Sequence, residues 1–303
     1  MPMTRTEILK RIQLRQSTIK DYLLCPLMFR YRHVERIEPS WRSSAAMHGT
    51  TLHKLIELIH RDKWNLRVEH HYREIFDSLE YDGEEAHIPV FWEDRDKELA
   101  AYEANAIEIL DGYRRRHENQ VAWVLYAEQP FRVKVAGHYF TGTIDQVRRN
   151  PDGSVELVDF KSNRQQPHPA YLANDWQMAL YSYALRYGDL WVGGEWIRPR
   201  LMVDAAAWYH LRGHEIRKRR TVNGAAGEEK LADPVLRVRK SIEDLRGFRE
   251  DVRRLLNVML KDWHYPNPNA CSFCGYREIC AQRHQAIPVD LIEEARELLE
   301  DVA

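Results

Sequence analysis

The chain has 303 residues, of which 44% are hydrophobic and 30% charged, so it has enough apolar material for one large folded domain. No apolar run could span a bilayer, and the first residues lack the apolar core of a secretory signal, so we expect a cytoplasmic protein without a membrane partner. The net charge of −1 excludes a polycation. Basic runs at 114–116, 217–220 and 237–240 are usually solvated surface, but they also suit a groove that follows phosphates.

The N-terminal part predicts helices. Residues 4–24 have helical spacing with Ser17 as a plausible N-cap, and Cys25-Pro26 interrupts them. A second helix carries Gly49 near its start and His53 beside its apolar stripe. A single histidine in that position is usually structural, so the helix alone does not make His53 a ligand.

Further along, residues 60–94 predict a loop-rich or irregularly helical insertion, and residues 96–117 predict a long helix. Alternating residues over 121–135 predict a strand, which a short turn connects to a hairpin over 142–161.

The hairpin brings charged residues together. If Pro151, Asp152 and Gly153 form a three-residue loop, Asn150 pairs with Ser154. The same register places Asp145 opposite Asp159, with Lys161 projecting from the same face two residues later.

Opposed carboxylates destabilise a sheet, whereas a divalent cation between them would turn the repulsion into a ligand set for Mg²⁺ or Mn²⁺. The alternative is an exposed hairpin with solvated charges and one lysine–aspartate contact. The hairpin alone leaves both interpretations open.

A helix after residue 169 ends at Gly188, and Gln177 and Tyr181 share one of its faces, which by itself indicates an ordinary helix surface. Strands are expected at 195–203 and 206–211, followed by a polar excursion over 212–234. The remaining segments predict a helix from Ile242 to about Leu260, capped by Ser241 and Asp244, and an acidic helix over 286–303.

Four cysteines form an unusual pattern: Cys271, Cys274 and Cys280 lie close in sequence, and Cys25 lies far away. Disulfides are not expected in a cytosolic chain of this size. A four-thiolate site suits either tetrahedral Zn²⁺ or a [4Fe–4S] cluster. The spacing does not decide between them, and unligated cysteines are a third option.

Together these motifs resemble the RecB-like group of PD-(D/E)xK nucleases. Members with an iron–sulfur clasp, such as AddB-type exonuclease domains, the CRISPR adaptation nucleases and eukaryotic single-strand exonucleases, are the most similar. The resemblance rests on six motifs in the family's order: Cys25-Pro26, the helix with Gly49 and His53, Gly142-Thr143-Ile144-Asp145, Val158-Asp159-Phe160-Lys161, Gln177-x3-Tyr181 and Cys271-x2-Cys274-x5-Cys280.

The resemblance implies a fold and a set of roles. The fold would be an α/β restriction-endonuclease-like core, a mixed central sheet flanked by helices, in one domain over 1–303. Segments 1–40 and 262–285 would form the clasp, with Cys25, Cys271, Cys274 and Cys280 holding a [4Fe–4S] cluster in preference to zinc. His53, Asp145, Asp159 and the Phe160 carbonyl would bind Mg²⁺ or Mn²⁺, with Glu128 as a further outer ligand.

In that scheme Lys161 orients the attacking water and neutralises charge on the phosphate, and it could accept the water's proton if desolvation lowers its pKa. Gln177 and Tyr181 support the substrate and the site.

The implied activity is metal-dependent DNA hydrolysis, as an exonuclease on single-stranded DNA or DNA ends, in recombination, repair, CRISPR adaptation or phage DNA metabolism. A helicase or an integrase-type protein is a possible partner. The alternatives are a non-cleaving DNA-binding scaffold within a larger complex and a structural zinc protein with incidental carboxylates.

Overall fold

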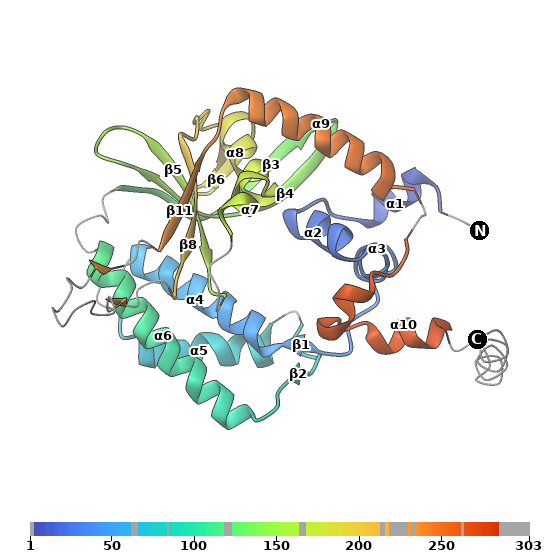
Figure 1. Ribbon diagram of the computed structural model, residues 1–303, viewed down its shortest axis with the longest axis horizontal. Coiled ribbons are helices and arrows are strands. Elements are labelled where there is room, and N and C mark those ends of the chain that lie inside the picture. Colours follow the sequence, from blue (N-terminus) through green and yellow to red (C-terminus); the bar gives the residue numbers. More distant parts are fainter. Residues whose placement is uncertain are drawn as a thin grey trace, which may run out of the picture.

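A mixed seven-stranded sheet lies at the centre of the structure (Figure 1). The computed structural model describes residues 3–61, 66–83, 85–117, 123–163, 168–212, 216–217, 230–231, 234–261 and 264–284. The strand order is β11-β8-β5-β4-β3-β6-β7, with β5 parallel to β8 and the other neighbours antiparallel. The strands are β3 (Val124–Val135), β4 (His138–Arg149), β5 (Val155–Lys161), β6 (Asp189–Val192), β7 (Glu195–Ile197), β8 (Ala205–His210) and β11 (Val235–Arg239).

Helices cover both faces of this sheet, as the expected α/β class requires. One apolar core joins the sheet to helices at the top and right of Figure 1, namely α1 (Arg5–Arg11), α2 (Gln16–Leu24), α8 (Trp176–Tyr187) and α9 (Ile242–Met259). A second core joins the opposite face to the lower helices α4 (Ser44–Arg61), α5 (Val68–Asp77) and α6 (Arg95–His117). The α/β architecture with a mixed, helix-flanked sheet is therefore confirmed.

The β4–β5 hairpin has the register that its turn predicts. Asn150 N donates to Ser154 O at 2.9 Å, and Gly153 has a φ of 84°, which favours glycine. The ladder runs from Arg149↔Val155 to Gln146↔Val158 and ends there, one residue before Asp145 on β4 and Asp159 on β5. Local turn chemistry thus sets the position of the two carboxylates.

The expected single helix over 4–24 is wrong, because the chain forms two helices with a break at residues 12–15. In the break Leu14 pairs with Phe140, and Leu14 O accepts a hydrogen bond from Thr141 N at 3.0 Å. A backbone contact with β4 therefore replaces helical hydrogen bonds. Arg15 is the N-cap of α2, and Ser17 lies inside the helix.

Other expected elements also differ. The 60–94 insertion, by contrast, is irregularly helical, one of the two forms expected: α5, which buries Tyr72 and Phe76, is followed directly by a π-helix. The helix expected before Gly188 is two helices, α7 (Pro169–Ala173) and α8, because Asp175 caps a new helix start. Strand β6 was not expected, and only Glu195–Ile197 of 195–203 is strand. Short strands are β1 (Arg42–Ser43), β2 (Val90–Phe91), β9 (Ile216–Arg217) and β10 (Lys230–Leu231).

Most of the 212–234 excursion and the whole 286–303 segment lie outside the described residues. Within the described part, no helix is long and apolar enough to cross a membrane.

Residues 27–37, from the N-terminal part of the chain, lie against residues 265–276 from the C-terminal part at the right of Figure 1. Leu27 N donates to Tyr265 O at 3.1 Å, and Tyr276 OH donates to Ile37 O at 3.1 Å. A small third core joins Leu27 to Tyr276 and Ala270. The elements here are α3 (Pro26–Phe29), η1 (Arg30–Glu35), η4 (Pro268–Phe273) and α10 (Arg277–His284), with η2 (Ser78–Asp82) in the helical insertion.

Candidate active site

Strands β4 and β5 separate at the two aspartates. Beyond Gln146↔Val158, the Asp145 carboxylate accepts a hydrogen bond from Phe160 N at 2.9 Å. A side chain thus takes the place of a strand carbonyl and keeps the Phe160 N–H satisfied. Asp145 and Asp159 are both buried, at 7% and 1% exposure. Two acidic groups therefore lie inside the protein where strand pairing ends.

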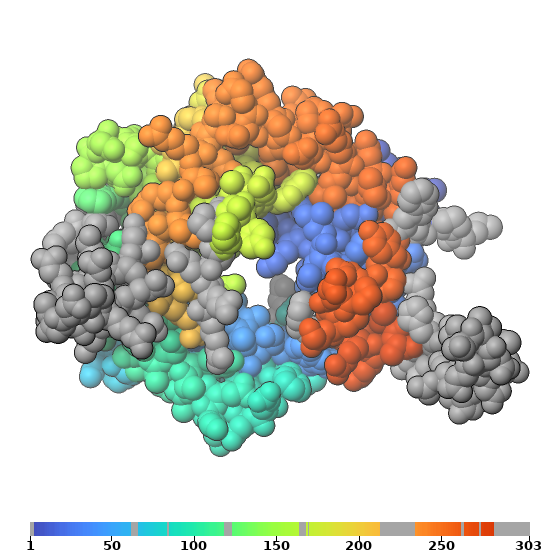
Figure 2. Space-filling view, in the orientation of Figure 1, coloured from blue at the N-terminus to red at the C-terminus, as the bar shows by residue number. Residues whose placement is uncertain are grey.

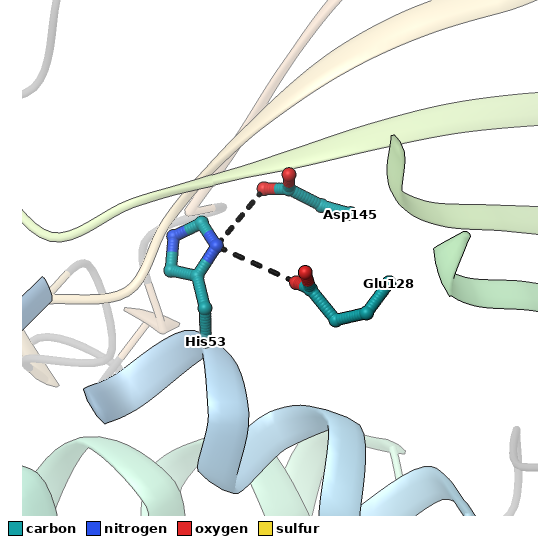
Figure 3. Close-up of side chains that lie close together, drawn as sticks. All are labelled: His53, Glu128 and Asp145. Carbon is teal, nitrogen blue, oxygen red and sulfur yellow. Dashed lines mark ion pairs between the residues drawn. The ribbon is translucent and has the colours of Figure 1, made fainter. Parts of the chain in front are cut away.

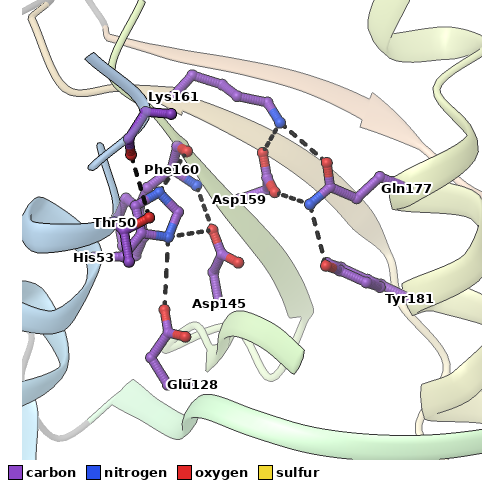
Figure 4. Close-up of polar contacts among 10 residues, drawn as sticks. Thr50, His53, Glu128, Asp145, Asp159, Phe160, Lys161, Gln177 and Tyr181 are labelled. Carbon is purple, nitrogen blue, oxygen red and sulfur yellow. Dashed lines mark hydrogen bonds and ion pairs between the residues drawn. The ribbon is translucent and has the colours of Figure 1, made fainter. Parts of the chain in front are cut away.

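Helix α4 brings His53 to this point. Its apolar stripe of Leu52, Leu55, Ile56 and Ile59 is buried, which fixes the rotation of the helix against the sheet. His53 Nδ1 lies 3.3 Å from Asp145 Oδ2, and Nε2 lies 3.0 Å from Phe160 O (Figures 3 and 4). One turn earlier, a Cβ at Gly49 would lie 3.0 Å from Ser162 Oγ, so Gly49 lets the helix approach closely.

Glu128 is the third acidic group. Pairs Ala127↔Gln146 and Gln129↔Ile144 flank it, so the register places it opposite Asp145. Its φ of 45° is rare for a residue with a side chain. Figure 3 shows its carboxylate turned toward His53, at 3.6 Å from Nδ1. Sequence reasoning gave Glu128 only a secondary place, because the signal lies in strand register rather than in a motif.

His53, Glu128 and Asp145 are suited to a divalent metal ion. Each offers one ligand atom, and these atoms lie within 4.8 Å of one another. The buried carboxylate of Asp145 and the half-buried carboxylate of Glu128, opposed across β3 and β4, would repel each other without a cation. An imidazole with two carboxylates accepts Mn²⁺ as well as Mg²⁺. The donor set therefore fits the expected metal.

Asp159 belongs to a neighbouring group rather than to that set of three. Gln177 Nε2 donates to Asp159 Oδ1 at 2.6 Å and lies 3.1 Å from Tyr181 OH, and Gln177 Oε1 accepts from Lys161 Nζ at 3.1 Å. Lys161 also forms an ion pair with Asp159 (Figure 4). Helix α8 thus holds the lysine and the aspartate together through Gln177.

The charges in the site perturb one another. Burial favours the neutral imidazole of His53, but the carboxylates of Asp145 and Glu128 outweigh it and raise the His53 pKa to about 9. Burial raises the pKa of Asp159 to about 6 although Lys161 opposes the shift, and burial also raises the pKa of Asp145. Clustered perturbed groups in a buried position are typical of a functional site.

Lys161 could accept a proton only if desolvation lowered its pKa, and this condition is not met in the structure. Burial does oppose the charged ammonium, but the adjacent Asp159 carboxylate outweighs burial and raises the Lys161 pKa. Lys161 is therefore a charged donor that can stabilise negative charge, and not a ready proton acceptor.

All four cysteines line one pocket of about 280 Å³ between α3 and the C-terminal segment. Cys25 is buried, and its Sγ accepts a hydrogen bond from Asn267 N at 3.4 Å. Burial raises the pKa of the Cys274 thiol, and the three other cysteines raise it further. Thiolates this close would repel one another unless a cation balanced them.

The spacing of the sulfur atoms bears on the kind of metal. Among the described residues, no three cysteine sulfurs lie within 4.8 Å of one another. Tetrahedral zinc with Zn–S bonds of about 2.3 Å would need sulfurs about 3.8 Å apart. The cysteine sulfurs are therefore more widely spread than in a closed tetrahedral zinc site.

Comparison with known proteins identifies the family. Residues 13–281 match the PD-(D/E)XK nuclease superfamily, so the chain belongs to this superfamily. Membership implies a metal-dependent nuclease.

Two solved structures resemble the chain at low sequence identity. A protein described as a "Putative exonuclease" from Eubacterium rectale has 13% identity and a TM-score of 0.49, over 92% of this chain and 90% of that one. The protein SSO0001 has 12% identity and a TM-score of 0.33, over 78% of this chain and 95% of that one. A search of curated proteins found no match.

Proposed function

We propose that the protein is a Mg²⁺- or Mn²⁺-dependent deoxyribonuclease that hydrolyses phosphodiester bonds as an exonuclease, on single-stranded DNA or DNA ends. One observation carries the proposal: His53, Glu128 and Asp145 converge on the end of the hairpin that also positions Lys161. The superfamily match supports hydrolysis, and the oxygen-rich donor set supports the choice of metal.

His53, Asp145 and Glu128 would hold the ion, with the Phe160 carbonyl beside them and Asp159 free to join once Lys161 turns toward the substrate. When bound, the ion would supply Lewis-acid polarisation of the phosphate and a more acidic bound water.

The chain's own residues would supply the remaining chemistry. Charged Lys161 would stabilise negative charge on the phosphate, because its ammonium is held in a buried setting by Gln177. Gln177 would keep Lys161 and Asp159 at a fixed separation. Tyr181 carries a pKa raised by burial, so its hydroxyl would stay neutral and act through hydrogen bonds to Gln177.

An opening in the molecule supports a substrate with a free end. Figure 2 shows the opening between α4, α2 and the C-terminal segment of η4 and α10. A pocket of about 670 Å³ borders α2, α4 and the C-terminal segment, and its lining includes Thr50, one turn before His53, with Lys20 and Arg42. The lining also includes the acidic side chains of Asp21 and Glu85, and Arg42 donates to three backbone carbonyl groups. The pocket therefore offers room for an unpaired strand beside His53 rather than a row of free cations.

The test is a cleavage assay with Mn²⁺ or Mg²⁺ on end-labelled linear DNA and on circular single-stranded DNA. Linear strands should be degraded and circles spared. Asp159→Ala or Lys161→Ala should lower the rate at least a hundredfold. The first removes the proposed further metal ligand and partner of Lys161, and the second removes the ammonium that acts at the phosphate.

Asp251→Ala, which removes an exposed carboxylate from α9, is the matched control and should keep full activity. Undiminished cleavage by pure Asp159→Ala and Lys161→Ala proteins contradicts the proposal. DNA binding without cleavage of any substrate by the unaltered protein would favour the scaffold alternative.

We also propose that Cys25, Cys271, Cys274 and Cys280 hold a [4Fe–4S] cluster. The shared pocket supports a common metal site, and sulfurs spread more widely than tetrahedral zinc requires support the larger cluster over zinc. The cluster would join the two ends of the nuclease and have a structural role.

A further inference from the structure

An exposed strip of the sheet starts at the candidate active site and runs along β3 and β4. At the active site Glu128 of β3 lies opposite Asp145 of β4. Further along the same two strands, Arg132 lies opposite Thr141 and Lys134 lies opposite Tyr139. Since alternate residues share a face, these positions point to the side opposite the buried Phe131, Val133 and Phe140. Four residues of strand place Arg132 about 14 Å from Glu128, and six place Lys134 about 20 Å away.

The β6–β7 hairpin extends this strip with two tryptophans. Trp191 and Trp196 are directly opposed, their ring centroids lie 5.3 Å apart, and they are 41% and 38% exposed. The Arg132 guanidinium lies 4.4 Å from the Trp196 ring centroid. On β4, Tyr139 is 67% exposed and Lys134 Nζ lies 5.6 Å from its ring centroid. Each cation is thus paired with an aromatic ring.

The charge of the strip is positive where the rings are. Arg132 and Arg198 both bond the Asp189 carboxylate, so two guanidinium groups share one acid. Lys134 adds a further positive charge. Glu195 is two residues from Ile197 on β7, so both side chains point to the same face of the sheet. Ile197 packs on the core, so Glu195 lies on the face opposite the strip and does not reduce its positive charge.

We propose that this strip binds single-stranded DNA and leads it to the active site. The inference rests on the proposed function and specifies its substrate class. Exposed rings offer stacking surfaces to bases of any sequence, and the adjacent cations offer contacts to the phosphates. Paired bases cannot stack on a protein ring, so the strip favours unpaired strands over duplex. The strip residues are Arg132, Lys134, Tyr139, Thr141, Trp191 and Trp196.

The test measures binding of a fluorescent oligothymidylate by anisotropy in the presence of EDTA, so that cleavage plays no part. The double variant Trp191→Ala/Trp196→Ala should bind at least tenfold more weakly, because two stacking rings are lost. The double variant Trp191→Phe/Trp196→Phe keeps an aromatic ring at both positions, so its affinity should remain within about threefold of that of the unaltered protein. Lys134→Glu should weaken binding and reduce its salt dependence.

Tyr81→Ala is the matched control, since Tyr81 is an exposed ring with the Arg95 guanidinium 6.0 Å from its centroid, away from the strip. Its affinity should not change. The proposal is overturned if the double alanine variant binds the oligonucleotide as tightly as the unaltered protein does, or if Tyr81→Ala loses as much affinity as the double variant. Tighter binding of duplex than of single-stranded DNA would also overturn it. Loss of nuclease activity alone would concern the proposed function, because this assay contains no metal.

Discussion

Two histidines on α4 show how neighbours decide the charge of a buried imidazole. Burial lowers the pKa of His48 to about 4, because Tyr72 OH and Asn105 Oδ1 contact its two nitrogens without adding negative charge. His53, five residues later, has its pKa raised to about 9 by two carboxylates. The third histidine of α4, His60, also has its pKa lowered to about 4 by burial, so at neutral pH only His53 of the three is charged.

His48 makes the stability of the fold dependent on pH. An unfolded histidine binds a proton near pH 6.5, whereas folded His48 does so only near pH 4, so the unfolded state takes up more protons as pH falls between these values. From pH 7 to pH 5 this should cost about 2 kcal/mol of unfolding free energy. Between pH 7 and pH 5 the unfolding free energy of His48→Asn should fall by about 2 kcal/mol less than that of the unaltered protein. Urea unfolding at both pH values measures this difference.

His70 on α5 provides the control, because it is exposed. His70→Asn should show the same pH difference as the unaltered protein. An equally large pH difference in His48→Asn would contradict the assignment of the effect to His48.

At the scale of elements, two glycines on neighbouring helices have opposite surroundings. Gly188 ends α8 where the helix meets β3, and a Cβ there would lie 2.6 Å from Arg132 O and 2.8 Å from Ala184 O. Gly247 lies on the exposed face of α9, where a Cβ would meet nothing within 4 Å. The first glycine permits close packing, whereas the second only lowers helix propensity.

Alanine at these positions should therefore change stability in opposite directions. Gly188→Ala should lower the unfolding free energy by about 2 kcal/mol or more, because the clash is with backbone that cannot move aside. Gly247→Ala should raise it by about 1 kcal/mol. Denaturant unfolding of both variants is the measurement, and a similar effect of the two substitutions would contradict the packing argument.

The elements also show what sequence could predict. The β4–β5 register followed from Asn150 to Ser154, because turn chemistry is local. The break at Leu14 did not follow, because its partner Phe140 lies more than a hundred residues away. Glu128 was underrated for a related reason: its position depends on how β3 pairs with β4 and on a rare backbone conformation.

Within the candidate site, sequence motifs brought together the same residues that the structure does, but not their pairing. Asp145 contacts His53, while Asp159 contacts Lys161 and Gln177. The Lys161 pKa is raised rather than lowered, because the direction of the shift depends on how close the Asp159 carboxylate lies to the Lys161 ammonium. Such distances are set by packing of α8 on the sheet, which a motif does not encode.

At the scale of the whole molecule, the cysteine pocket joins the two ends of the described chain. Its small core of Leu27, Tyr31, Ala270 and Tyr276 lies apart from the two cores that hold the sheet. Metal ligands recruited from both ends would couple cluster binding to docking of these segments. Loss of the cluster should therefore release the ends first and leave the sheet folded.

Cys274→Ser should test this coupling, because it removes one thiolate from the pocket while leaving the main cores untouched. Anaerobically purified protein should contain about four irons per chain, and the variant should contain fewer and melt at a lower temperature. Hydrogen exchange should become faster over residues 264–284 and around Cys25, with protection kept in β4 and β5. Asn269→Ala, which alters an exposed residue of the preceding helix η4, should change none of these. Colourless protein with one zinc, or exchange that rises uniformly across the sheet, would contradict the proposed iron–sulfur clasp.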